Sequence, residues 1–316
     1  MIRIGITMGD PSGIGPEIIA KALPSITPLG QVVVIGDAWV FGRVCSFVHV
    51  PHETSFDFVE MANVPRKGFR FGRTDKAYGK ASLQYVDEAL ALLDRGLIDC
   101  LVTCPVSKEA VSLWRRGFSG HTEYLAGQAG VSRTVMMLLN RRLKFGLVTT
   151  HIPISRVASK ITAGKIRDTV TLTADSLRDL FGISHSSIAV AGLNPHASDN
   201  GVIGSEEGRL IAPALKKIRR AGFTLAGPLP ADTCCARALA GDFDAVVAMY
   251  HDQALIPLKT TDPLGGVNLT LGLPYVRTSP LHGTAFDIAG KGKAYPDSLI
   301  AAVRTAHKCS QLLKKG

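Results

Sequence analysis

The sequence has no long hydrophobic run, no C-x-x-C pair and no low-complexity linker. Even the apolar stretch QVVVIGDAWVF is interrupted by Asp37, and it falls short of the ~18 apolar residues that a membrane helix needs. The first residues, MIRIGITMGD, lead directly into a predicted strand without the apolar stretch of a signal peptide. We therefore expect a cytoplasmic protein with no membrane partner.

Cysteine and charge exclude two further classes of protein. The six cysteines are expected to be reduced thiols, because the chain is long and carries no export signal. The formal charge is +10, but lysine and arginine are scattered, and their longest clusters are LKKIRRAG and LLKKG. This distribution favours solvated helix faces over a nucleic-acid surface. A positive field would also help to gather a small anionic substrate.

Apolar residues make up 46% of the 316 residues and charged residues 20%, which is typical of a folded globular protein. Short β-branched runs such as RIGITMG, QVVVIGD and DCLVTCP alternate with helix-period stretches. This alternation predicts an α/β fold. Two amphipathic helices are predicted in KASLQYVDEALALLDRG and IRDTVTLTADSLRDLFG, each ending at a glycine.

A Gly-rich turn follows the first predicted strand in GITMGDPSGIGPEII. Pro16 stands at the start of the following helix and Glu17 in its first turn. Such a turn leaves backbone N–H groups available for an anion. It matches neither G-x-G-x-x-G nor a Walker A loop, so a structural turn is the alternative.

Three predicted strands end at a histidine: LKFGLVTTH at His151, IAVAGLNPH at His196 and AVVAMYHDQ at His251. Open α/β sheets bind ligands at the carboxyl ends of their strands, and imidazole is the commonest ligand of divalent transition metals. The three histidines indicate a metal site. The alternative is three separate histidines in turns, because their spacing differs from H-E-x-x-H.

Two further segments offer groups that suit an anion. His121 and Thr122 lie in a Gly-flanked loop before a predicted helix, where a helix cap is the alternative. Lys259, Asn268 and Arg277 are spread along strand-like segments with glycine turns. A lysine and an arginine near one cleft are a natural clamp for phosphate and carboxylate, although each also fits a solvated surface position.

The motifs together resemble a known family. HGTAFDIAGKG strongly resembles the adenosine-binding loop of the β-decarboxylating isopropylmalate and isocitrate dehydrogenases, and GDPSGIGPEI resembles their N-terminal turn. The motifs SGHTEYLA, VTTHIP, LNPHAS, GPLPADT and YHDQALIPLK resemble the 4-hydroxythreonine-4-phosphate dehydrogenase family of vitamin B6 biosynthesis. The resemblance covers essentially the whole chain. It implies an isocitrate/isopropylmalate-dehydrogenase-like fold with two α/β lobes, an active-site cleft between them, and a homodimer with shared active sites.

The resemblance also implies lobes and residue roles. Residues 1–115 and 262–316 would form the cofactor-side lobe, and residues 116–261 the metal, substrate and dimerisation lobe. The implied metal ligands are His151, His196 and His251, with the site completed across the dimer and zinc, magnesium, cobalt or manganese as the metal. The implied substrate-binding residues are His121, Thr122, Lys259, Asn268 and Arg277. The implied cofactor is NAD, with NADP as the alternative, bound by the loop containing His282, Gly283, Asp287 and Gly290.

The implied reaction is oxidation of 4-hydroxythreonine 4-phosphate at the C3 hydroxyl, followed by decarboxylation to 3-amino-2-oxopropyl phosphate. In the implied reaction a bound metal would polarise the hydroxyl while hydride is transferred to the nicotinamide, and the resulting 3-oxo acid would lose CO2. Asp252 or Asp232 would accept the hydroxyl proton, and Lys259 would assist by its charge.

Two alternatives remain open at this point. A sister family decarboxylates erythronate or threonate 4-phosphate to dihydroxyacetone phosphate, and no motif here distinguishes the amino from the hydroxyl group at C2. A metal-dependent hydrolase or an anion-binding protein would use the histidines without NAD. The motif HGTAFDIAGKG argues against this last class.

Overall fold

The β-branched runs of the sequence form the strands of an α/β protein, and most of the amphipathic stretches form helices. A computed structural model describes residues 1–218 and 222–314. It contains two compact units, one made of Met1–Gly130 with the chain from Leu273 onward, the other of Val131–Gly272. Within the described ranges, no helix is long and apolar enough to cross a membrane.

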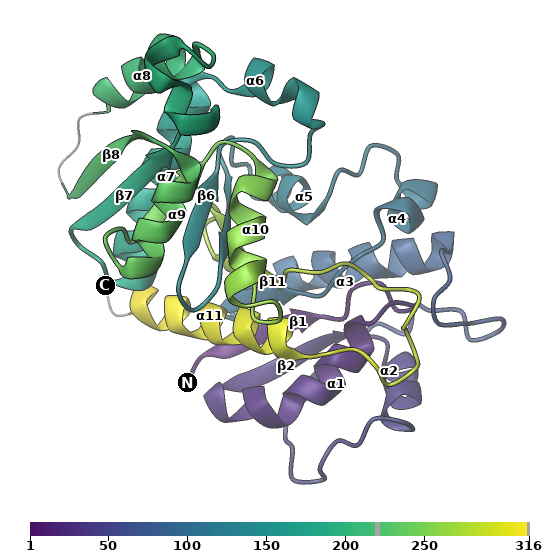
Figure 1. Cartoon of the computed structure of the whole chain (residues 1–316). Helices are drawn as coiled ribbons and strands as arrows, with labels where there is room; N and C mark the ends of the chain where they lie inside the picture. The colour runs from purple at the N-terminus through teal and green to yellow at the C-terminus, as the bar shows by residue number, and fades with distance from the viewer. Residues whose placement is uncertain (219–221, 315–316) are drawn as a thin grey trace. The chain divides into compact units, whose positions relative to one another are not determined.

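The first unit is built on a parallel sheet with the strand order β3-β2-β1-β4-β11 (Figure 1). Its strands are β1 (Arg3–Thr7), β2 (Gln31–Gly36), β3 (Asp57–Glu60), β4 (Cys100–Thr103) and β11 (Val276–Pro280). The chain runs from β1 outward to β2 and β3 and then returns to the other side of β1. The strand order therefore reverses between β1 and β4, and open α/β sheets bind ligands at such a point.

Helices cover both faces of this sheet. They are α1 (Gly15–Ile26), α2 (Ala38–Cys45), α3 (Lys76–Asp94), α4 (Lys108–Trp114), α5 (His121–Gln128) and α11 (Asp297–Leu313), with a short 3-10 turn, η1 (Thr27–Leu29), after α1. Helix α11 packs on β4 and β11 beside α1, whereas α3 packs on the opposite face against β1 and β2 (Figure 1).

The second unit has the strand order β10-β5-β6-β9-β7-β8. Its strands are β5 (Val135–Leu139), β6 (Lys144–Leu147), β7 (Ser186–Ala191), β8 (Phe223–Leu229), β9 (Ala245–Ala248) and β10 (Val267–Leu271). Strand β5 pairs antiparallel with β10 and β6, and the remaining pairs are parallel. The carboxyl ends of β6, β9 and β7 therefore meet at one edge of the sheet.

The helices of the second unit also lie on both faces. They are α6 (Val157–Lys160), α7 (Ala163–Phe181), α8 (Ala212–Lys216), α9 (Ala231–Ala240) and α10 (His251–Thr261), with the short helical turns η2 (Ile154–Arg156), η3 (Pro195–Gly201) and η4 (Glu207–Ile211), the last of them a π-helix. Helix α7 packs on one face, and α9 and α10 pack on the other (Figure 1).

Of the two helices predicted to end at a glycine, α7 does so, and α3 ends two residues before one. Helix α7 begins after Thr162, whose side chain accepts a hydrogen bond from the backbone of Lys165, and ends at Gly182 in the left-handed conformation. Helix α3 ends at Asp94, and after its C-cap residue Arg95 comes Gly96, which is also left-handed. The α/β prediction is confirmed.

Candidate functional site

Two of the three strand-end histidines lie side by side. His151 follows β6 and His251 follows β9, the strand next to it, and the centroids of their rings are 5.4 Å apart. The three predicted strand ends are corrected in detail: β6 ends at Leu147, β7 at Ala191 and β9 at Ala248, so each histidine lies a few residues beyond its strand, and His251 is the first residue of α10. The side chains of His151 and His251 nevertheless meet at the carboxyl edge of the sheet.

The His251 ring has a carboxylate partner. Its Nδ1 lies 2.7 Å from Oδ1 of Asp252, which is itself mostly exposed. A carboxylate at Nδ1 fixes the tautomer that leaves Nε2 as a lone-pair donor. Asp232, the other predicted base, is an exposed residue in the first turn of α9.

His196 lies beyond β7, the other neighbour of β9. It is the first of five consecutive non-glycine residues, His196 to Asn200, with φ between 43° and 70°. This left-handed conformation costs roughly 1–2 kcal/mol for each L-residue. Imidazoles from three adjacent strand ends are a donor set that suits a divalent metal. Among the described residues of this chain, however, no group of three histidine, cysteine or acidic side chains could hold one.

The predicted anion-binding residues of the first unit share a positive environment. His121 and Thr122, expected in a loop, are the first two residues of α5. Arg277 on β11 is 2% exposed, and its guanidinium donates to Oγ1 of Thr103 at 2.6 Å. Burial lowers the pKa of Arg277 to about 10. Burial, together with the positive charges of Arg277 and Lys108, lowers the pKa of His121 well below its usual range.

His121 is therefore neutral at physiological pH and stands beside fixed positive charge. Its buried Nε2 has no hydrogen-bond partner among the described residues. A neutral imidazole, a buried guanidinium and the Thr122 hydroxyl together suit a phosphate or carboxylate oxygen.

The two remaining substrate candidates belong to the second unit. Lys259, expected in a strand-like segment, lies instead in the last turn of α10, and its ammonium donates to the carbonyl oxygen of Pro263 at 3.2 Å. Asn268 lies on β10 as expected, and in the described chain its buried Oδ1 has no hydrogen-bond partner. Both side chains have polar atoms to offer a ligand.

The Gly-rich turn after β1 contains a buried carboxyl group that the sequence did not single out. Oδ1 of Asp10 accepts hydrogen bonds from the backbone and the hydroxyl of Ser12, both at 2.9 Å. Burial raises the pKa of Asp10 to about 6, although the hydrogen bonds from Ser12 oppose the rise. Two backbone hydrogen bonds hold the turn in place. Asp10 N–H donates to the carbonyl oxygen of Pro105, just after β4, and Ile14 N–H donates to the carbonyl oxygen of Thr284 in the 282–290 loop.

The four candidate cofactor residues lie in one loop between β11 and α11. They are His282, Gly283, Asp287 and Gly290. Gly290 has a φ of 71°, and a Cβ there would lie 2.5 Å from the ring of Phe71, so the loop passes this ring too closely for a side chain. Lys291 donates to the Asp287 carbonyl oxygen at 2.6 Å.

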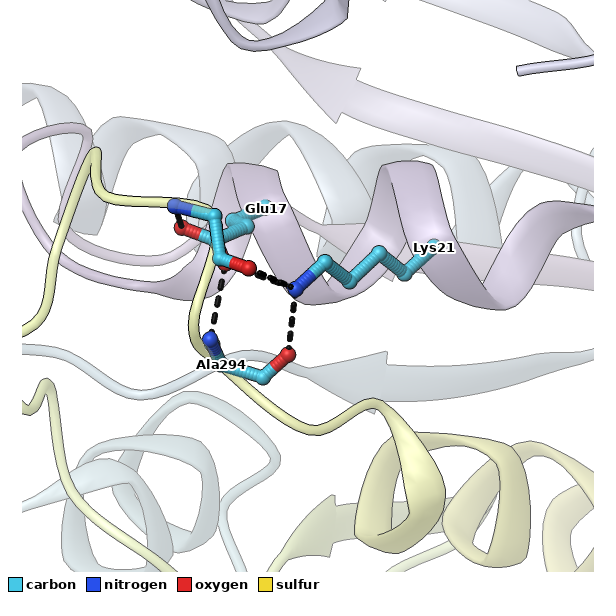
Figure 2. A network of polar contacts seen from close by, with 4 residues as sticks. Glu17, Lys21 and Ala294 are labelled. Carbon is cyan, nitrogen blue, oxygen red and sulfur yellow. Dashed lines mark hydrogen bonds and ion pairs between the residues drawn. The ribbon is translucent and has the colours of Figure 1, made fainter. Parts of the chain in front are cut away.

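Helix α1 holds the far end of this loop through two residues (Figure 2). The buried Glu17 carboxylate accepts hydrogen bonds from the backbone of Ala294 at 2.8 Å and of Gly292 at 3.2 Å. The Lys21 ammonium contacts Glu17 at 2.9 Å and donates to the carbonyl oxygens of the same two loop residues. The candidate cofactor loop is therefore held near its start by Ile14 of the Gly-rich turn and at its far end by Glu17 and Lys21 of α1.

A family model described as pyridoxal phosphate biosynthetic protein PdxA matches residues 29–306. The chain belongs to the PdxA family. The 4-hydroxythreonine-4-phosphate dehydrogenase of Desulforapulum autotrophicum is 43% identical, covering 96% of this chain and 94% of its own. The D-threonate 4-phosphate dehydrogenase of Cupriavidus necator is 42% identical over 95% of each chain. A 4-hydroxythreonine-4-phosphate dehydrogenase structure from Klebsiella pneumoniae has a TM-score of 0.88 at 37% identity, covering 98% of this chain and 100% of that one.

PdxA membership confirms the resemblance stated from the sequence motifs, and the relatives' names make this a family of dehydrogenases. Several residues that shape the site in this PdxA-family chain were missed by sequence reasoning, namely Asp10, Lys108 and Lys21. Asp10 alone had a local signal, since Asp-Pro-Ser after a strand favours a side-chain-bonded turn.

Proposed function

We propose that this protein is a metal-dependent NAD dehydrogenase that converts 4-hydroxythreonine 4-phosphate to 3-amino-2-oxopropyl phosphate and CO2 during pyridoxal phosphate synthesis. The observation that carries the proposal is the His151–His251 pair, 5.4 Å between ring centroids, at adjacent strand ends of a PdxA-family chain. We further propose that the enzyme acts in the cytoplasm as a homodimer.

His151, His196 and His251 are the residues that would hold the metal, with ligands from both protomers completing each site. A divalent ion bound there supplies Lewis-acid polarisation of the substrate hydroxyl. Asp252 keeps the His251 ring in one tautomer, and either Asp252 or Asp232 accepts the hydroxyl proton. Lys259 assists that transfer by its positive charge.

Arg277, His121 and Thr122 are assigned to an anionic group of the substrate, together with Lys259 and Asn268. Arg277 is suited to this because its buried guanidinium presents several donors in a fixed plane. The neutral His121 adds a hydrogen bond without requiring a second buried charge. The substrate carries both a phosphate and a carboxylate, so there is an anion for Arg277, His121 and Thr122 and another for Lys259 and Asn268.

The loop containing His282, Gly283, Asp287 and Gly290 is assigned to the adenosine end of NAD. A carboxylate at the ribose hydroxyls favours NAD over NADP, because it would repel a 2′-phosphate. Asp287 is the residue proposed for that contact.

Replacing Glu17 by glutamine is expected to raise KM for NAD about tenfold while kcat changes less than about twofold. The substitution removes the charge from two hydrogen bonds that shape the cofactor loop, and hydrogen bonds to charged groups contribute ~1.5–3 kcal/mol. Steady-state kinetics with varied NAD measures this. Glu53→Gln, at an exposed glutamate, is the control. Equal rises in the KM values of NAD and of the phosphorylated substrate would contradict a role confined to the loop.

A second candidate substrate is D-threonate 4-phosphate, because a relative 42% identical over 95% of this chain carries that activity in its name. The two substrates differ at C2, where an amino group replaces a hydroxyl. The same residues would bind the phosphate and carboxylate of either compound.

One assay tests both candidates. Purified protein is mixed with NAD, a divalent metal and either phosphorylated acid, and NADH absorbance is followed with and without a chelator. We expect NADH from 4-hydroxythreonine 4-phosphate, with a kcat/KM at least about tenfold above that for D-threonate 4-phosphate, and none after chelation. Absence of NADH with both substrates would refute the dehydrogenase proposal, and the reverse preference would select the second candidate.

A further inference from the structure

The five left-handed residues that begin at His196 need an external restraint. His196, Asp199 and Asn200 belong to residue types that are enriched in this conformation, whereas Ala197 and Ser198 do not. Five such residues in a row are still costly, and an unrestrained chain would leave this conformation. Something outside the turn must therefore keep His196 where it is.

Glu207 supplies one restraint. Its buried carboxylate accepts hydrogen bonds from the backbone N–H groups of Leu193 and Asn194, each at 2.7 Å, and from the Asn194 side chain at 2.9 Å. These three donors lie directly before the turn. Charge-assisted hydrogen bonds of this kind are about twice as strong as neutral ones.

Close packing leaves the turn little room to relax toward β7. A Cβ on Gly192 would lie 3.0 Å from Cα of Ala197 and 3.1 Å from Oε1 of Glu207. Ser198 is buried, and its carbonyl oxygen accepts a hydrogen bond from Ile203 N–H at 2.9 Å. The turn is thus packed against the end of β7 and against the Glu207 carboxylate.

Gln253 joins this turn to the strand end that carries His251. Its Oε1 accepts from Met249 N–H at 2.7 Å, and its Nε2 donates to the Gly192 carbonyl oxygen at 2.8 Å. One side chain therefore fixes the end of β9 relative to the end of β7.

We infer that Glu207 and Gln253 are positioning residues for the metal site, holding His196 in register with His151 and His251. The inference rests on the proposed function, because it requires the three histidines to bind a metal. Neither residue contacts the metal in this assignment. Both act on the backbone that presents His196, and a displaced ligand weakens binding even when every histidine is retained.

The test is a titration of the metal-free, full-length protein with Zn2+ alone, with affinity measured by chelator competition. We expect Glu207→Ala to weaken Zn2+ binding by about 10–100-fold, the usual cost of losing a group that orients a ligand. Glu207→Gln, which keeps one acceptor oxygen, is expected to fall between that variant and the unmodified protein. Glu206→Gln is the matched control, since Glu206 contacts the Asn194 side chain but neither backbone N–H of the loop, and its affinity should change less than about threefold.

Gln253→Met keeps the volume of the side chain and removes both hydrogen bonds, so it tests the second restraint even if Glu207→Ala fails to fold. A drop of about tenfold in Zn2+ affinity, with an unfolding midpoint close to that of the unmodified protein, would separate positioning from general stability. Unchanged Zn2+ affinity in Glu207→Gln and Gln253→Met would overturn the positioning role of these two residues but not the proposed metal site. Failure of the unmodified protein to bind Zn2+ would overturn the proposed metal site and the inference together.

Discussion

Replacing His251 by alanine is expected to abolish both metal binding and turnover. The substitution removes one ring of the pair whose centroids are 5.4 Å apart and leaves Asp252 without its imidazole partner. Lewis-acid stabilisation contributes several kcal/mol, and each 1.36 kcal/mol corresponds to about a tenfold change in rate. We therefore expect kcat to fall at least about a thousandfold, with substoichiometric metal by atomic absorption.

His185→Ala is the matched control for this substitution. His185 is an exposed histidine of the same unit that lies just before β7, at the opposite end of the strand from His196. Its removal should leave metal content and kcat unchanged. Normal metal content and activity in His251→Ala would show that the metal ligands are misassigned.

Replacing Arg277 by methionine is expected to raise KM for the phosphorylated substrate about a hundredfold or more without destabilising the fold. Removing one member of a buried charge pair costs about 2–5 kcal/mol of binding. The folded protein without substrate already bears the cost of burying the guanidinium, as the lowered pKa of Arg277 shows. A methionine side chain at this position carries no charge and so avoids that desolvation cost.

The combination of weaker substrate binding with undiminished stability makes this prediction specific. KM is measured by steady-state kinetics and stability by the urea midpoint. Arg304→Met, at an exposed position on α11, should change neither quantity. A lower midpoint with unchanged KM would mean that Arg277 serves the fold instead of the substrate.

Local patterns predicted the elements well because their causes are local. The left-handed glycine that ends α7 and the alternation of apolar runs with amphipathic stretches are visible in the chain itself. The position of His251 at the start of α10 was missed, since Met249 and Tyr250 extend the apolar pattern beyond the end of β9.

The site depended on information that is not local. The sequence suggested that the three histidines act together, but not that their strands are neighbours in the order β6-β9-β7, because the chain visits these strands in the order β6, β7, β9. Glu17 contacts Ala294 across 277 positions, and no pattern in either segment signals the other. The turn from His196 to Asn200 contains no glycine, the usual sign of a left-handed backbone.

The division of the first unit between the two ends of the chain bears on how the protein is synthesised. The whole of Val131–Gly272 is synthesised before β11 and α11. Until then, β4 presents an unpaired edge where β11 will lie, and the face that α11 covers is open to solvent. Arg277, on that last strand, arrives late. A nascent chain stalled before residue 276 therefore lacks this arginine and exposes a sheet edge of the kind that chaperones protect.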